Sequence, residues 1–216
     1  MPQAPDGSGP RRRAVLAAAA LAPLAMAGCS ADASGSAAHG PKPAPKDALV
    51  MVIRHAEKPY AGDMGEGAEG NEDPASLAGR GRRRAEELHR LFPPAGGSAL
   101  PRPAAVFAAG GPAGTPASCR RTVEPLAKVL RAPLRGEFAV GAEEALARAA
   151  LAAPMPVLVC WEHTGIPRLI RSLGADRVLG IPAVWPDRYD MVWMLTRQQG
   201  RWSFRELPQH LLPGDA

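Results

Sequence analysis

Short apolar runs alternate along the chain with segments whose apolar residues recur at helical spacing. Three runs are continuously apolar over five or six residues: Ala48–Ile53, Ala104–Ala109 and Val157–Trp161. Strands covered on both faces show this pattern, whereas half-exposed strands alternate polar and apolar residues. We therefore expect three strands in the interior of a sheet.

Helical periodicity follows each of these runs. Apolar residues spaced three and four apart predict one buried face of a helix. Helices are expected from about Arg80 to Phe92, along the stripe Val123, Leu126, Ala127 and Leu130, over Ala142–Ala152, and along the stripe Ile166, Leu169, Ile170 and Leu173. Pro167 suits the first turn of the last of these helices.

The chain ends with a pattern typical of a β-hairpin. Two strands, Tyr189–Thr196 and Arg201–Leu207, flank a turn at Gln199–Gly200. Strands that alternate with helices predict parallel pairing. The expected fold is an α/β fold, a three-layer α/β/α domain with a largely parallel mixed sheet.

Composition excludes several classes of protein. The 216 residues are 46% hydrophobic and 22% charged, which is typical of a soluble globular domain. Three cysteines are too few for a scaffold built on disulfides. The formal net charge of +5 is mild, and the basic segment Arg80–Arg84 is followed by Glu86 and Glu87, as on a solvated helix face. No nucleic-acid partner is therefore expected.

The N-terminus has the pattern of an export signal. Three arginines at 11–13 precede the apolar stretch Ala14–Ala27, which is too short to cross a bilayer comfortably. Met26-Ala27-Gly28-Cys29 resembles a bacterial lipoprotein cleavage box with Cys29 as the lipidated residue. We expect a signal peptide over 1–28, the lipidated cysteine and a disordered tether over 29–47, and a folded domain over 48–216. The membrane would be a partner through the lipid anchor.

Polar residues suited to catalysis follow two of the buried runs. Arg54 and His55 come directly after the first run, and Glu162 and His163 directly after the third. Arg120 and Arg121 stand before the second expected helix. Ligands bind outside the carboxyl ends of parallel strands, so these residues are candidates for a common site.

These segments resemble the signatures of the histidine phosphatase superfamily, which has a phosphoglycerate-mutase-like fold. The resemblance rests on their order along the chain, from about Leu49 to the end. Its segments are Val52–Lys58 (VIRHAEK), Leu77–Gly81 (LAGRG), Arg121-Thr122 ahead of Glu124–Ala127, Trp161-Glu162-His163, and Trp185–Trp193 (WPDRYDMVW).

The resemblance implies a phosphatase that acts through a phosphohistidine. Neutral imidazole is nucleophilic near pH 7, so His55 would attack the phosphorus. Arg54, Arg121 and His163 would surround the phosphoryl group, because guanidinium donors match its oxygens in a fork geometry. The substrate would be a small phosphorylated molecule, and neither a cofactor nor a metal is expected.

The sequence departs from the family pattern in two places. Either Arg120 or Arg121 could be the second pocket arginine; Arg121 fits the family spacing if Pro125 replaces a threonine, and Arg120 is then an additional substrate-binding candidate. Thr164 stands where one branch carries an acidic proton donor. Glu137, Glu143 and Glu144 stay open as alternative donors, and without a donor the rate should depend steeply on the leaving group.

Other interpretations also remain at this point. His55-Ala56-Glu57 matches the H-x-E of zinc deaminases, but the P-C-x-x-C segment that they need is absent from the sequence. Cys119 and Cys160 could form a disulfide in an exported protein or stay as buried thiols. The alternative function is a lipoprotein that binds a phosphorylated ligand with little or no turnover.

Overall fold

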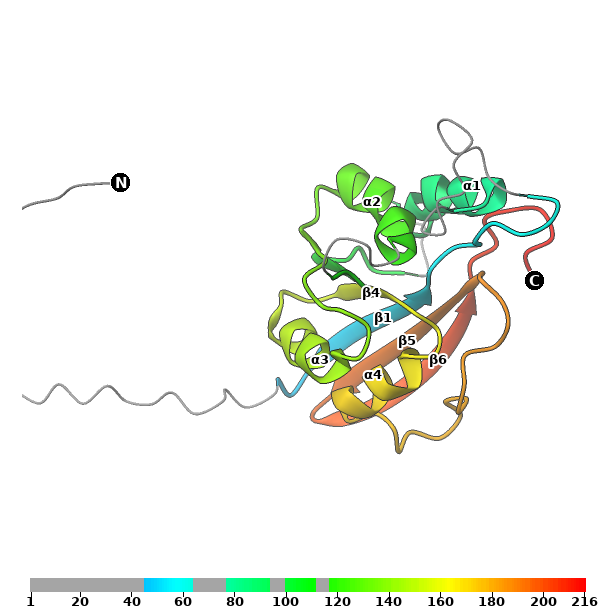
Figure 1. Ribbon diagram of the computed structural model, residues 1–216. Helices are drawn as coiled ribbons and strands as arrows, with labels where there is room; N and C mark the ends of the chain where they lie inside the picture. The colour runs from blue at the N-terminus through cyan, green and yellow to red at the C-terminus, as the bar shows by residue number, and fades with distance from the viewer. Residues whose placement is uncertain (1–44, 64–76, 94–99, 112–116) are drawn as a thin grey trace, which may run out of the picture. The chain divides into compact units, whose positions relative to one another are not determined.

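The buried runs form the centre of a six-stranded sheet with the order β3-β2-β4-β1-β5-β6 in the computed structural model (Figure 1). The four strands from β3 to β1 are parallel, and β5 and β6 pair antiparallel as a hairpin beside β1. The strands are β1 (Ala48–Arg54), β2 (Ala105–Ala108), β3 (Leu134–Arg135), β4 (Val157–Trp161), β5 (Met191–Gln198) and β6 (Arg201–Pro208).

The structure describes residues 45–63, 77–93, 100–111 and 117–216. Strand β1 begins at Ala48, the residue at which the folded domain was expected to begin. The expected signal peptide, Cys29 and most of the expected tether lie outside the described residues. Within these residues, the structure contains no helix with the length and apolar character needed to cross a membrane.

Helices cover both faces of the sheet. Helices α1 and α2 lie together on one face, and α3 and α4 lie together on the other (Figure 1). They span α1 (Gly79–Glu87), continued by the 3₁₀ turn η2 (Leu88–Leu91), α2 (Ser118–Leu130), α3 (Glu143–Ala152) and α4 (Ile166–Leu173). The α/β fold with three layers and a largely parallel mixed sheet is thereby confirmed.

Burial explains why the three runs are apolar throughout. Every residue of β2 and β4 is buried, as is every residue of β1 except Leu49, because helices cover both sides of these strands. Edge strand β6 instead alternates exposed with half-buried residues, and its Trp202 and Phe204 pack against the core. The central strands are therefore covered on both faces, and the β6 edge of the sheet is more exposed to solvent.

Candidate active site

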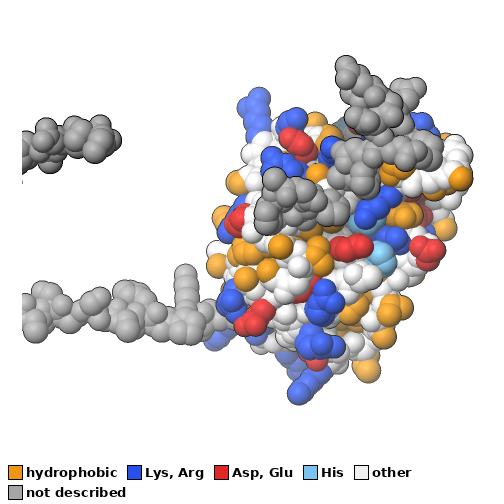
Figure 2. Space-filling view, in the orientation of Figure 1, with side chains coloured by type: hydrophobic (Ala, Val, Ile, Leu, Met, Phe, Trp, Pro, Cys, Tyr) orange, Lys and Arg blue, Asp and Glu red, His pale blue; other side chains and the backbone are white. Residues whose placement is uncertain are grey.

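Strands β1 and β4 meet the condition under which open α/β sheets commonly bind ligands. These strands are parallel neighbours, yet the helices that follow them, α1 and α4, lie on opposite faces of the sheet. The two chain segments therefore diverge beyond the strand ends, which is where open α/β sheets bind ligands. His55 follows β1 and Glu162 follows β4. The backbone N–H of His55 donates to the Trp161 carbonyl at 3.4 Å. Figure 2 shows histidine atoms among basic and acidic side chains on one face of the molecule.

His55 is almost completely buried, with 2% of its surface exposed. Its Nδ1 lies 2.8 Å from the carbonyl oxygen of Ala56, so the Nδ1–H donates to the backbone. This bond fixes the ring orientation and turns Nε2 toward the site. Nε2 is buried and has no hydrogen-bond partner among the described residues. The arrangement presents one ring nitrogen for chemistry.

Arg54 is also buried, with 7% exposed, and its guanidinium stacks over the Tyr189 ring at 4.1 Å from the ring centroid. Nη2 donates to the Tyr189 hydroxyl, and Nη1 donates to Asp187 Oδ1, each at 3.2 Å. The Nε–H is buried and has no partner in the part of the chain that the structure describes. A buried charged group with an unused donor is costly unless a ligand completes it.

Glu162 connects the two histidines through a single carboxylate oxygen. Its Oε2 lies 3.3 Å from His55 Nε2, at ion-pair distance but out of line for a hydrogen bond. The same oxygen lies 3.1 Å from His163 Nδ1 and accepts the His163 backbone N–H at 2.7 Å. The interaction with His55, above all, holds the pKa of Glu162 at about 2 against the opposing effect of burial, and His163 adds to it. Glu162 is therefore a carboxylate in this structure.

The structure brings Arg54, His55 and His163 together. The His55 and His163 rings are edge to face with centroids 6.4 Å apart, and the Tyr189 ring lies 6.0 Å from His55. Tyr189 belongs to the Trp185–Trp193 segment that carries part of the family resemblance. This segment therefore forms one side of the site.

Arg120 and Arg121 occupy the first turn of α2 and are both exposed. The Arg120 guanidinium approaches Gly136, in the loop after β3: its Nη1 lies 3.7 Å from the position that a Cβ on this glycine would take. Their neighbour Thr122 reaches the site: its hydroxyl accepts the Ala56 N–H at 2.9 Å and donates to the Ser118 carbonyl at 2.7 Å. The start of α2 thus contacts the residue after His55, while the choice between the two arginines stays a prediction.

The three glutamates expected as proton donors have other partners. Glu137 pairs with Arg135 and Glu144 with Arg148 at exposed positions. Glu143 is buried, accepts the Trp161 Nε1–H at 3.1 Å and pairs with Arg168. Burial raises the pKa of Glu143, but its contacts with Arg168, Gly141 N–H and Trp161 outweigh burial, and the net pKa is lowered. Glu143 therefore ties α3 to β4 and α4 as a carboxylate.

Glu162 was expected at this edge of the sheet, but the sequence assigned it no chemical role. Its position directly after a buried strand was visible, but its side chain folds back to the backbone N–H of the next residue. That local bend brings the carboxylate to His55, which lies 107 positions earlier in the chain. Apolar periodicity contains no signal for such a contact.

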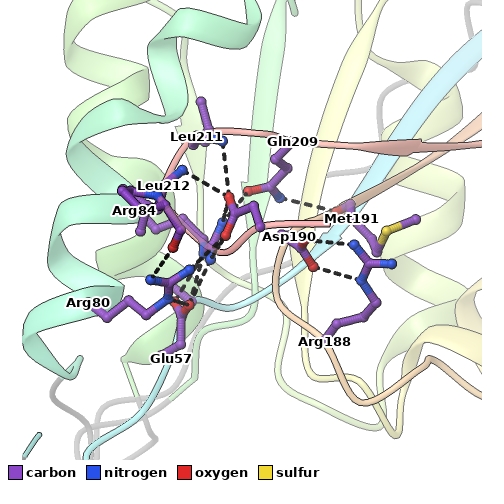
Figure 3. Close-up of polar contacts among 12 residues, drawn as sticks. Glu57, Arg80, Arg84, Arg188, Asp190, Met191, Gln209, Leu211 and Leu212 are labelled. Carbon is purple, nitrogen blue, oxygen red and sulfur yellow. Dashed lines mark hydrogen bonds and ion pairs between the residues drawn. The ribbon is translucent and has the colours of Figure 1, made fainter.

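A buried ion cluster anchors the loop that follows His55 (Figure 3). Glu57 accepts hydrogen bonds from Arg84 and Arg80, and both arginines also pair with Asp215 near the end of the chain. The Ala78 N–H donates to the Glu57 carbonyl at 2.9 Å. A Cβ on Gly81 would lie 2.3 Å from that carbonyl oxygen, so α1 approaches the loop only because Gly81 lacks a side chain.

His55, Glu162 and His163 could also hold a metal ion, because one ligand atom from each lies within 4.8 Å of the others. Two histidines and one carboxylate are a known ligand set for catalytic zinc. The Arg54 guanidinium, buried beside His55, disfavours a second cation at this position. The donor set permits a metal, and the neighbouring charge favours an anion.

Cys119 and Cys160 are free thiols, buried on α2 and β4. Burial, and then the neighbouring Cys119, raise the pKa of the Cys160 thiol. Of the two alternatives left open by the sequence, the structure therefore contains the buried thiols and not the disulfide.

No model of a known protein family matches the chain, and no curated protein is significantly similar to it in sequence.

Proposed function

We propose that this protein hydrolyses phosphate monoesters through a phosphohistidine formed on His55. One observation carries the proposal: two buried polar atoms, His55 Nε2 and Arg54 Nε, lack a hydrogen-bond partner within the described residues and belong to adjacent side chains. A nucleophile and a cationic donor left open together are what a phosphoryl group requires.

The proposed reaction has two steps. In the first, the lone pair on His55 Nε2 attacks phosphorus, and the ester P–O bond breaks with its electrons on the leaving oxygen. In the second, water attacks the phosphohistidine and the N–P bond breaks, which returns the electron pair to Nε2 and releases phosphate. Arg54 and His163 would stabilise the charge that spreads over the equatorial oxygens.

The present partners of Arg54 are compatible with ligand binding. Asp187, its ion-pair partner, has a side chain that is 98% exposed, so water can solvate this carboxylate when it leaves the guanidinium. A phosphoryl oxygen can then replace it with a second charge-assisted hydrogen bond from Nε. Tyr189 would keep the guanidinium plane in place from the opposite side.

Turnover of an aryl phosphate by the full chain tests this function. We expect release of inorganic phosphate at a rate that chelation with EDTA leaves unchanged, because Arg54 supplies the positive charge that a metal would otherwise provide. Tight binding of phosphate without any turnover would instead support the binding-protein alternative. Loss of turnover on chelation, restored by zinc, would assign His55, Glu162 and His163 to a metal centre.

The two arginines of α2 can be separated by mutation. Arg121→Ala should lower kcat/KM by about 30- to 1000-fold, the effect of removing one fixed electrostatic donor from the transition state. Arg120→Ala should change it by less than about 5-fold, because the Arg120 guanidinium approaches Gly136. Steady-state kinetics with an aryl phosphate would measure both. The reverse order would show that Arg120 is the pocket arginine.

We further propose that the protein is exported and held at the membrane by lipid on Cys29, facing the periplasm or the cell exterior. A lipid anchor contributes about 0.8 kcal/mol per buried CH₂, enough for stable partitioning with more than one chain. The wild-type protein should therefore pellet with membranes, and Cys29→Ser should be released or left unprocessed. Equal solubility of the two forms in a fractionation experiment would contradict the anchor.

A further inference from the structure

Glu162 is the carboxylate that the described contacts place against the nucleophile. Its Oε2 lies 3.3 Å from His55 Nε2. The His55 side chain is almost completely buried, and the Glu162 side chain is half-buried. The His55 ring cannot turn away, because its Nδ1–H is held by the Ala56 carbonyl at 2.8 Å. The carboxylate is held as well, by the His163 N–H at 2.7 Å. The two reacting atoms are thus fixed from both sides.

The 3.3 Å contact is favourable only with a proton between these two atoms. With the ring proton of Nδ1 committed to the backbone, an unprotonated Nε2 would leave two electron-rich atoms 3.3 Å apart, and the two would repel each other. A proton on Nε2 converts this contact into an ion pair. The same proton blocks attack on phosphorus, so it has to leave Nε2 before His55 can react.

We propose that Glu162 is the acid–base residue of this site: its carboxyl receives the proton from His55 Nε2 when the phosphoryl group binds and donates it to the leaving oxygen. The proposal rests on the phosphoryl transfer through His55 proposed above. Glu162 would then be the proton donor that the sequence left open. Thr164 has no acidic group, and Glu137, Glu143 and Glu144 are paired with arginines elsewhere.

The proton balance closes over the two steps. Transfer of the proton to Glu162 frees the Nε2 lone pair, which forms the N–P bond as the P–O bond breaks. The leaving oxygen takes the proton from Glu162 and departs as an alcohol. The Glu162 carboxylate then accepts a proton from water, whose oxygen bonds to phosphorus while the N–P bond breaks. Phosphate is released, and the proton on Glu162 remains available to Nε2.

The bound substrate itself favours the first proton transfer. A phosphate monoester brings up to two negative charges next to the carboxylate, and a like charge makes a carboxyl group hold its proton more strongly. Within the described part of the chain, the neighbouring acidic groups are committed elsewhere. Glu57 is bound by Arg84 and Arg80, and Asp187 is exposed and paired with Arg54.

The test compares leaving groups in the wild type and in Glu162→Gln. The wild type should show a shallow dependence of kcat/KM on leaving-group pKa. Glu162→Gln keeps the shape but cannot transfer a proton, so kcat/KM should fall about 10²- to 10⁴-fold with an alkyl phosphate and less than about 5-fold with an aryl phosphate. Glu87→Gln, on the surface of α1 in an ion pair with Arg90, is the matched control and should behave as the wild type does.

The ratio of alkyl to aryl turnover decides the outcome. Both substrates are assayed on one preparation, so the ratio does not depend on the fraction of the variant that folds. If Glu162→Gln yields no folded protein, Glu162→Asp is used in its place. Because aspartate can still transfer a proton, its ratio of alkyl to aryl turnover should stay closer to that of the wild type than to that of an enzyme without a proton donor. An equal loss on both substrates, or no loss on either, would overturn the proposal while leaving the phosphatase function standing. Absence of wild-type turnover with every phosphate monoester would instead overturn the function itself.

Discussion

His55→Ala should lose turnover of aryl phosphates by on the order of 10⁴- to 10⁶-fold, the size of loss that follows removal of a covalent nucleophile. The methyl group of alanine offers no lone pair at the position of Nε2. The fold should survive, because the substitution removes one ring at the edge of the core. Initial-rate kinetics and a thermal melt of the same sample would measure both effects.

His89→Ala is the matched control for this prediction. His89 lies in η2, and its Nδ1 contacts the Glu86 carbonyl at the surface. Its removal should leave kcat and KM within about 2-fold of the wild type. An active and folded His55→Ala protein would refute the nucleophile assignment.

Arg84→Met should lower the free energy of unfolding by about 3–5 kcal/mol, the typical cost of removing one partner from a buried charge cluster. Arg84 is 2% exposed and donates to both Glu57 and Asp215, with Gln209 beside them (Figure 3). Without the Arg84 guanidinium, the two buried carboxylates would be left with the more exposed Arg80 as their cationic partner. Turnover should fall as well, because Glu57 holds the loop that follows His55.

Chemical denaturation would measure this loss, with Arg83→Met as the control. Arg83 is the exposed neighbour on the same helix, and its substitution should change the unfolding free energy by less than about 0.5 kcal/mol. Equal midpoints for the two variants would show that the cluster contributes no net stability.

The same cluster predicts a dependence of stability on pH. Burial raises the pKa of Asp215, but hydrogen bonds from Arg84 and from the backbone outweigh burial and hold the pKa below its usual value. A carboxyl that is more acidic when folded than when unfolded stabilises the protein above the unfolded pKa, about 4, and loses this contribution as the pH falls. The melting temperature should therefore drop below about pH 4, and Asp215→Asn should make that drop smaller.

The central strands were predictable because their environment leaves a direct trace in the sequence. Burial on both faces demands continuous apolar residues. The apolar run Val157–Trp161 has the same bounds as strand β4. The helix expected from Arg80 to Phe92 is α-helical only as far as Glu87. Its last turn is the tighter 3₁₀ turn Leu88–Leu91, which ends before Pro93. Strand β3 was missed because it has two residues, too few for any period to show.

The candidate site was predictable only where its residues lie at or just after strand ends. Arg54, His55 and His163 were found because parallel strand ends meet at one edge of the sheet. Tyr189 and Asp187 reach Arg54 across more than 130 positions of sequence, a distance over which local pattern says nothing. Glu143 was an open candidate for the proton donor because its buried partners, Trp161 and Arg168, are visible only in three dimensions.

The most direct test of the proposed chemistry is to trap the covalent intermediate. The wild-type protein would be mixed with an aryl phosphate labelled at phosphorus, quenched within one turnover and digested, and the labelled peptide would be sequenced by mass spectrometry. We expect an acid-labile, base-stable phosphoryl group on His55, absent from His55→Ala and present in Glu87→Gln. Steady release of phosphate with no label on His55, or a label on another residue, would contradict it.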